Sequence, residues 1–550
     1  MTRILTLFTA SALAAQSAWA CGGFFCNNQG VPIEQNAERI LFAVDEDAGT
    51  VETHVQIFYE GPADEFAWIV PVPANPEVSV TTDRLFAQLS SMLAPRFILN
   101  VVNEDGCETR LFPGGQNFAM NDVAVASSAG TGTEAETVSV SQAGNVGPYE
   151  MVVVQAETEA ELLDWLQANN YNIPDNVGPA LAPYVAQDAY FLALRLRKNV
   201  GTGSLTPIAF TYPGDQASVP IQLTSIAASD DMRVEAYILG KERAVPESYL
   251  HVEINEASID WWNNGDNYYE VITQAADEAG GQAFATDYSG GAWILIDSLM
   301  PRWLGMQDVD LTNRNTPDAI VDELRRHNWT FDDELLGVLK TCMTIHNGVS
   351  AEEFADCPSC YTKVQDVDGV ACDNAVQTML IDPLQHAEAL FERHPTITRL
   401  SSSMSANEMT VDPVFVFNPD MPEVSALRFA TETYRCGSVL RNQEQVTREL
   451  ELSDGRMLLI PSVNWLERNE TTEAEILAEQ RTIAAQRIAE TRRSGDPTVL
   501  ADFSDDLAEA ARAHNRWIRG FGGGCQNAPL APSGLLIGLL GGLGLARRRR

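Results

Sequence analysis

The sequence is poor in positive charge. Its 550 residues include 36 lysines and arginines against 76 aspartates and glutamates, which gives a formal net charge of −40. A surface this acidic repels phosphate backbones, so the composition argues against nucleic acid as a partner. Solubility in a salty or calcium-containing exterior is the simplest interpretation of the excess acid, and a specific cationic partner is the alternative.

Several catalytic signatures are missing as well. The chain has no G-x-S-x-G nucleophile elbow, no H-E-x-x-H zinc helix and no P-loop, which argues against the enzyme classes that depend on them. Its seven histidines are scattered, and the pair His386 and His394 is expected to face solvent. Carboxylates are plentiful, so a glycosidase-type pair stays open, although no spacing singles one out.

The N-terminus has the three parts of a secretory signal peptide. Residues 1–20 begin with a positive charge at Arg3, continue as an apolar stretch and end in the small-x-small site Ala18-Trp19-Ala20. We expect a signal peptidase to cut after Ala20 and to leave Cys21 as the new N-terminus. Lipidation of Cys21 is the alternative, although Trp19 is bulky for that motif. The segment therefore predicts an exported protein.

A short hydrophobic tail, residues 522–550, closes the chain. Its apolar run corresponds to about 21 Å of helix, and Arg547 to Arg550 are expected to stay cytoplasmic because arginines cross a bilayer at high cost. The tail resembles the C-terminal sorting tags of myxobacterial surface proteins, with glycine-flanked Cys525, a glycine-leucine span and an arginine cluster. The resemblance implies cleavage near Cys525 by a sorting protease and transfer to the cell surface or outer envelope. Permanent anchoring in the inner membrane by the uncut tail is the alternative.

The body between these ends is predicted as an α+β fold, with antiparallel sheets and flanking helices. A strand is predicted at residues 38–44, alternating apolar residues predict a second at residues 51–60, and a later strand is predicted at residues 220–226. Apolar residues at helical spacing predict helices at residues 82–93 and 317–326.

The C-terminal part of the body is predicted as a helical stalk, residues 466–520. Interleaved charges predict one long polar helix at residues 471–493, and a second helix follows at residues 505–517. A partner-binding helix pair is the alternative. The remaining body divides into a β-rich domain, residues 21–340, and a cysteine-containing continuation, residues 341–465.

Several motifs resemble a bacterial domain-of-unknown-function family, number 2330. The first three are Cys21-Gly22-Gly23-Phe24-Phe25-Cys26, Gln35-Asn36-Ala37-Glu38-Arg39-Ile40-Leu41-Phe42 and Phe66-Ala67-Trp68-Ile69-Val70-Pro71-Val72-Pro73. Later ones are Glu278-Ala279-Gly280-Gly281-Gln282-Ala283-Phe284 and the run at residues 398–420. The resemblance spans roughly residues 21–440 and implies export, but it implies no activity, fold or catalytic residue.

Eight of the nine cysteines lie outside the tail. An even number in an exported chain favours up to four disulfides, and the sequence leaves their pairing open. The eight are Cys21, Cys26, Cys107, Cys342, Cys357, Cys360, Cys372 and Cys436. Four of them cluster between residues 342 and 372, where they could also bind zinc or provide a redox C-x-x-C. Irregular spacing and crowding favour disulfides in a knotted loop.

Asp366, Asp368 and Asp373 are the candidate metal ligands. Together with Gly369 their spacing resembles a calcium loop with its glycine bend. A third ligand before the glycine and a closing glutamate are missing, so a plain acidic turn is the favoured interpretation and bound calcium is the alternative. Calcium is the one cofactor that the sequence suggests.

The combined prediction is a surface or envelope protein whose body is a non-enzymatic binding or structural module. An exported hydrolase that uses carboxylates and a periplasmic assembly accessory are the alternatives, and the stalk favours the latter. The aromatic group Trp261, Trp262, Tyr268 and Tyr269 could stack on sugar or peptide, but core packing or a clasp that holds a loop is the favoured interpretation. The extracellular ligand is not identifiable from the sequence.

Overall fold

The computed structural model describes most of the body. The residues described are 34–60, 67–103, 139–169, 171, 177–196, 206–346, 348–435 and 448–520. The predicted signal peptide, the predicted C-terminal sorting tail and the predicted processing residues Ala20, Cys21 and Cys525 lie outside these ranges, so they remain predictions.

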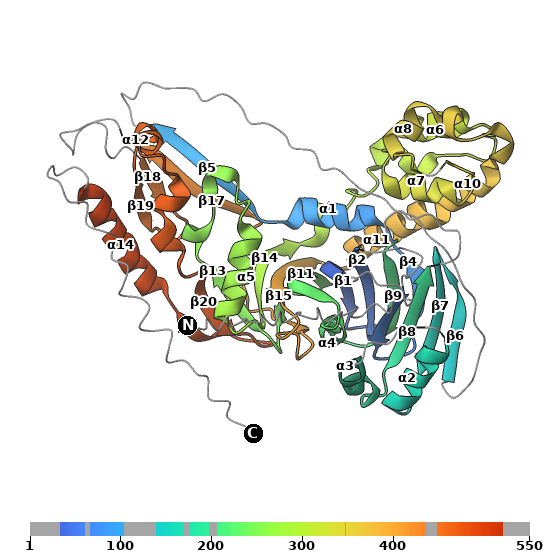
Figure 1. The fold of residues 1–550 in the computed structure, drawn as a ribbon, viewed down its shortest axis with the longest axis horizontal. Helices are drawn as coiled ribbons and strands as arrows, with labels where there is room; N and C mark the ends of the chain where they lie inside the picture. Colours follow the sequence, from blue (N-terminus) through green and yellow to red (C-terminus); the bar gives the residue numbers. More distant parts are fainter. Residues whose placement is uncertain are drawn as a thin grey trace, which may run out of the picture.

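Ten strands from the described part of the chain form one large mixed sheet (Figure 1). Most neighbouring strands are antiparallel, but the pairs β1–β11 and β13–β14 are parallel. The prediction of an α+β fold is confirmed, and the prediction of antiparallel sheets needs this correction, because apolar alternation does not show strand direction. In spatial order the strands are β21 (Thr498–Asp502), β20 (Ala485–Glu490), β13 (Leu250–Ile254), β14 (Ala283–Gly291), β15 (Thr396–Met404), β11 (Ala228–Gly240), β1 (Glu34–Asp45), β2 (Thr50–Glu60), β9 (Ile208–Pro213) and β4 (Glu77–Val80).

Three smaller sheets are present within the described ranges. The first packs on one face of the large sheet, and the third extends the fold beyond the end that carries β21 and β20 (Figure 1). Their strands, in spatial order, are β3 (Ala67–Val72), β8 (Tyr190–Leu196), β7 (Tyr149–Gln155) and β6 (Ser139–Val146); β10 (Ala217–Ser218), β16 (Val414–Phe417) and β12 (Ala244–Pro246); and β19 (Met457–Ile460), β18 (Arg448–Glu451), β17 (Leu427–Tyr434) and β5 (Arg96–Asn103).

Both faces of the large sheet are buried. On β1, Ile40 and Phe42 point to the core shared with β3, β7 and β8, whereas Leu41 and Ala43 point to the opposite core. Helices α1 (Asp83–Leu93), α5 (Tyr268–Glu278) and α11 (Asp382–Arg393) cover that second face. The strand prediction at residues 38–44 is therefore confirmed, and its buried apolar run matches a strand covered on both sides.

A helical lobe lies beside the sheet, at the upper right in Figure 1. It contains α6 (Pro317–Arg326), α7 (Asp333–Lys340), α8 (Ala351–Asp356), α9 (Pro358–Tyr361) and α10 (Gly369–Val376). The predicted knotted loop is wrong, because the cysteine cluster forms short capped helices. Ser350 and Glu353 make a capping box at the start of α8, a signal that the cysteine pattern obscured.

The predicted helical stalk is wrong for its first half. The segment at residues 471–493 contains the short helix α13 (Glu473–Ile476), a 3₁₀ turn and then strand β20, which pairs with β13. Ala484, Ala485 and Ile488 are buried against α5, and this burial overrides the helix propensity of the alanines and glutamates. Helix α14 (Ser504–Gly520) confirms the second half.

Two further predictions need correction. The run at residues 220–226 forms α4 (Ile221–Thr224) instead of a strand, because so short an apolar run fits a buried turn equally well. The boundaries at residues 340 and 465 do not separate structural units, since the large sheet takes β11, β15 and β20 from all three predicted segments. The stalk thus belongs to the body, and the support it lent to an assembly accessory is lost.

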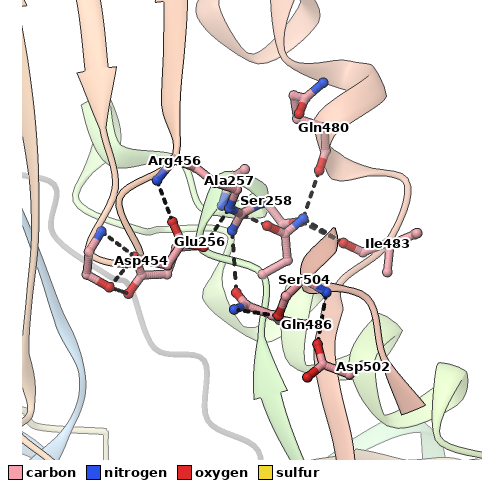
Figure 2. A network of polar contacts seen from close by, with 12 residues as sticks. Glu256, Ala257, Ser258, Asp454, Arg456, Gln480, Ile483, Gln486, Asp502 and Ser504 are labelled. Atoms are coloured by element: carbon pink, nitrogen blue, oxygen red, sulfur yellow. Dashed lines mark hydrogen bonds and ion pairs between the residues drawn. The ribbon is translucent and has the colours of Figure 1, made fainter. Parts of the chain in front are cut away.

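Asn255 attaches the C-terminal segment to the sheet. Its Nδ2 donates to the carbonyl oxygens of Gln480 and Ile483 at 2.8 and 2.7 Å, and its backbone N–H donates to Ala484 O at 2.6 Å. Figure 2 shows Gln480 and Ile483 converging on the turn that carries Ser258. Asn255 is fully buried; its bond to Gln480 is buried as well, whereas its bond to Ile483 is partly buried.

We expect Asn255→Ala to lower the free energy of unfolding by about 2–3 kcal/mol, because a buried carbonyl and a partly buried one lose their donor. Faster hydrogen exchange in β20 and β21, measured by mass spectrometry, is expected to accompany the loss in urea unfolding. Asn263→Ala is the control, since exposed Asn263 bonds only locally to Asp260. Equal losses in the two variants would contradict the role given to Asn255.

Candidate functional site

A row of polar side chains crosses the helix-covered face of the large sheet. Gln56 on β2 lies opposite Arg39 on β1, Arg39 lies opposite Glu235 on β11, and Glu235 lies opposite Ser401 on β15. Arg39 Nε donates to Glu235 Oε2 at 3.1 Å. Alternating side chains place these residues between two apolar cores, so the row interrupts the buried face. We call this row and its ion partners the central polar network.

Arg399 is the centre of this network. Its Nη2 lies 3.2 Å from Glu235 Oε2 and its Nη1 lies 3.3 Å from Asp287 Oδ2. Burial opposes the charge on Glu235, but Arg399 and Arg39 outweigh burial and lower the pKa of Glu235 to about 2. Burial raises the pKa of Asp287 although Arg399 opposes that shift. The environment therefore pushes the pKa values of the two carboxyls apart.

Helix α5 contributes two tyrosines to the network. Tyr268 donates its hydroxyl to Asp287, and Tyr269 donates to Glu235. Arg399 also donates to the Tyr269 oxygen at 3.2 Å. The predicted core packing of the aromatic group is confirmed for Tyr268 and for Trp261, both of which are buried.

The chemistry open to this network depends on access. Carboxyls with separated pKa values can act as an acid and a base, but only 5 % of Glu235 and 1 % of Asp287 and Arg399 is exposed. The central polar network reaches solvent at Arg233, whose guanidinium lies 4.1 Å from the centre of the Tyr269 ring. A substrate cannot reach the buried groups in this conformation. The network therefore joins six elements of the fold, β1, β2, β11, β14, β15 and α5, rather than forming an open reaction site.

A surface hollow lies where two of the motifs noted in the sequence meet. It has a volume of about 510 Å³ and is lined by Asp277, Gly280, Gln282, Asn407, Glu408 and Thr410. Gln282 Nε2 donates to Glu408 O and to Thr410 Oγ1, both at 2.8 Å. These bonds fix the loop after β15 against the end of α5.

Two carboxyls face each other at this hollow. Asp277 shares a hydrogen bond with Glu408, and burial together with Glu408 and Asp231 raises the pKa of Asp277. A hydrogen bond between two carboxyls requires that one of them carries a proton, and the raised pKa of Asp277 favours its protonated form. Sequence reasoning missed this pair because residues 277 and 408 are brought together only by the pairing of β14 with β15.

The three predicted calcium ligands have structural partners or point outward. Asp368 caps α10 by accepting from the backbone of Val370 and Ala371, Asp373 accepts from Leu311 N at 2.8 Å, and Asp366 is exposed. Among the described residues no three histidine, cysteine or acidic side chains are placed to hold a metal ion together. The geometry adds no support for calcium, which stays a prediction from the sequence.

Two disulfides lie in the helical lobe. Cys342 pairs with Cys372 across 30 residues, and Cys357 pairs with Cys360 across three. The four clustered cysteines are thus disulfide-bonded, as the favoured interpretation held. The other four cysteines for which disulfides are predicted lie outside the described residues. They are Cys21, Cys26, Cys107 and Cys436.

The histidine prediction is wrong for His394, which is buried and bonds to Leu390 O. His386 is half exposed, and its Nε2 lies 2.6 Å from Glu52 Oε1. His54 contacts the same oxygen at 2.9 Å. Burial opposes the charge on Glu52, but hydrogen bonds from His386 and His54 outweigh it and lower the pKa of Glu52. This contact joins α11 to β2.

A second charged contact joins α1 to the helical lobe. Asp83 N donates to Glu334 Oε1 at 2.7 Å, and Arg84 Nε lies 3.4 Å from Glu334 Oε2. Burial raises the pKa of Glu334 to about 8, with a further contribution from Asp83. Because this pKa exceeds the ordinary value of 4.5, the folded state keeps a proton that the unfolded state releases.

We therefore expect the stability contributed by Glu334 to be fully present below about pH 4.5 and to be lost as the pH rises through about 8. Glu334→Gln removes this dependence, so its advantage over the wild type should grow by on the order of 1 kcal/mol for each pH unit across that window. Melting curves at several pH values test this. Exposed Glu392→Gln is the control, and an equal pH trend in both variants would contradict the assignment.

The last of these features is an edge strand with exposed apolar side chains. In the described part of the chain β5 pairs with β17 alone and forms the edge of its sheet, as Figure 1 shows. Ile98, Val101 and Val102 are 36 %, 56 % and 47 % exposed. On the neighbouring strand, exposed Phe429 lies directly opposite Ile98. We call Ile98, Val101, Val102 and Phe429 the β5 edge patch.

Fold and site together define a mixed α+β protein with a sealed charge network at the centre of its sheet. A family model described as an uncharacterized protein conserved in bacteria, DUF2330, matches residues 15–290, half of the chain. The chain belongs to the DUF2330 family. No curated protein and no solved structure matches it.

The family match includes some of the residues described above and leaves out their partners. It ends within β14, so Glu235 and Asp277 lie inside it, whereas their partners Arg399 and Glu408 lie beyond it. No helix in the described ranges is both long and apolar enough to cross a membrane, and the predicted tail, residues 522–550, is not among those ranges.

Proposed function

We propose that this protein is an exported envelope protein whose body binds another polypeptide chain without catalysing a reaction. The observation that carries the binding role is the β5 edge patch. Within the described residues β5 pairs along one edge only. Large aliphatic side chains exposed together on such an edge strand are unusual on a soluble monomer, where edge strands are normally protected by charge, proline or a bulge. Such an edge accepts an extended segment as an added strand.

Several properties of β5 support this role. Its eight residues contain one charged side chain, Arg96, and no proline. The backbone of an edge strand offers a row of free hydrogen-bonding groups, and the exposed Ile98 and Val102 offer apolar contacts on one face. Main-chain bonds supply affinity in strand addition, whereas alternate side chains supply selectivity.

Export is the second part of the proposal. The signal peptide, residues 1–20, and the arginine-ended tail support it, as do two disulfides, because disulfides persist in oxidising compartments. Fractionation and protease treatment of intact cells test the location. We expect protease to reach the body in intact cells and Cys525→Ala to retain the chain in the inner membrane. A protected, thiol-reduced body would contradict export.

Binding is tested by cross-linking in intact cells. A photo-reactive amino acid at position 102 is expected to give adducts that disappear when Ile98→Lys is added. Position 499 on β21 is the control, because Val499 is equally exposed on another edge strand. Equal adducts at both positions, or none at position 102, would contradict a binding role for the β5 edge patch.

The hydrolase alternative has one observation in its favour, the carboxyl pair Asp277 and Glu408 at the surface hollow. A hydrolase of this kind would use the pair as general acid and base. The test is release of reducing ends from cell-wall glycan by the purified protein. Activity that Glu408→Gln abolishes, while the fold is retained, would establish the alternative in place of the non-enzymatic role.

A further inference from the structure

The β5 strand is complementary to itself. Its sequence reads Arg-Phe-Ile-Leu-Asn-Val-Val-Asn from residue 96 to residue 103, with apolar residues on both sides of Asn100. If two such strands run antiparallel with Asn100 opposite Asn100, Ile98 faces Val102 and Leu99 faces Val101. Opposed residues in an antiparallel pair point to the same face of the sheet, so each apolar residue meets an apolar residue.

This register is consistent with the face of the sheet on which each side chain of β5 lies. Phe97 is buried in the core beneath the small sheet, whereas Ile98 and Val102 are exposed on the other face. Pairing about Asn100 keeps Ile98 and Val102 of both copies on that exposed face, so the row of Phe429 and Ile98 continues into the second sheet. A one-residue shift would put exposed side chains opposite buried ones.

Charge also favours a second copy at this place. The chain carries a net charge of −40, so most surfaces of two copies repel each other. β5 has no acidic residue, and its single charge, Arg96, lies at the end of the strand. In the antiparallel arrangement the two Arg96 side chains lie at opposite ends of the interface.

We propose that the occupant of the β5 edge patch is a second copy of this chain. The two β5 strands pair antiparallel across a two-fold axis and join two four-stranded sheets into one sheet. This inference rests on the proposed function, because it names the partner for the same edge. A two-fold interface uses the same patch on both subunits, which is the property that the β5 sequence shows.

The first test measures the mass of the purified exported chain by sedimentation velocity over a range of concentrations. We expect the wild type to pass from one chain to two as concentration rises, and Ile98→Lys with Val102→Lys to weaken this association by about tenfold or more, since lysines oppose edge pairing. Val499→Lys with Leu500→Lys is the matched control on β21, where both residues are 48 % exposed. A wild type that stays monomeric, or a dimer that the β5 variant leaves intact, overturns the proposal.

The second test examines the register directly. Asn100→Cys brings two thiols opposite each other, within reach of a short bis-maleimide, and is expected to give a covalent dimer. Val499→Cys, treated in the same way, is expected to give none. Circular dichroism and melting curves establish that each variant is folded, and equal cross-linking of both variants overturns the proposed register.

The cell cross-link described above separates the two proposals. An adduct at position 102 with the mass of two chains supports both. An adduct of another mass, from a chain that sediments as a monomer, overturns the second copy and leaves the binding role intact. The absence of any adduct at position 102 contradicts both.

Discussion

Arg399→Met is expected to lower the free energy of unfolding by about 3–5 kcal/mol, the range for breaking a buried ion pair. The guanidinium of Arg399 lies between Glu235 and Asp287 in the centre of the sheet, and almost none of these three side chains reaches solvent. Methionine fills part of the space but leaves two buried carboxyls with less compensating charge. Urea unfolding, followed by tryptophan fluorescence, measures the loss.

Arg302→Met is the matched control for this prediction. Arg302 also contacts two carboxylates, Asp297 at 2.9 Å and Glu392 at 3.4 Å, but 73 % of its side chain is exposed. Exposed ion pairs contribute less than about 1 kcal/mol, so the same substitution should change stability little here. A loss in Arg399→Met as small as that of the control would show that the central polar network does not hold the sheet together.

Removal of the Cys342–Cys372 disulfide is the second large effect expected. The bond closes a loop of 30 residues, and in the chain-entropy model its loss through Cys342→Ala with Cys372→Ala costs about 3–4 kcal/mol. Buried Cys372 also packs in the core of the helical lobe. Thermal unfolding under non-reducing conditions, together with hydrogen exchange in α7 and α10, measures the effect.

The other disulfide provides the comparison. Cys357 and Cys360 are three residues apart, so their bond restricts the unfolded chain much less and its removal should cost about 2 kcal/mol or less. The exposed position of Cys360 means that little packing is lost with it. If the two double variants unfold at the same temperature, loop length does not govern how these disulfides stabilise the lobe.

Helix positions could be predicted where local signals agree. The helix predicted at residues 82–93 is α1, in which Thr82 caps the first turn by accepting from Leu85 N and one face buries Leu85, Phe86 and Leu89. The helix predicted at residues 317–326 is α6, which begins at Pro317 after the cap residue Thr316. A cap, a first-turn acid and an apolar face all lie within a few residues of one another, so the sequence shows them together.

The segment at residues 471–493 shows where such reasoning fails. Its alanines and glutamates favour a helix, yet Ala485 and Ile488 are buried because β13 offers a free edge with which β20 pairs. β13 lies more than 200 residues earlier in the chain, as the Asn255 contacts with residues 480 and 483 also show. No local pattern reports that a distant strand edge is available.

Residue order alone was enough to establish the acidic composition, the cysteine cluster, the α+β class and the family motifs, because each is a property of composition or of short stretches of chain. The central polar network and the Asp277–Glu408 pair could come only from the folded chain. Arg39 and Glu235 meet across 196 residues of sequence, and Arg399 joins them from a strand in the later half. Charged side chains occur throughout this sequence. Only the pairing of the strands decides which of them are buried side by side and therefore form ion pairs.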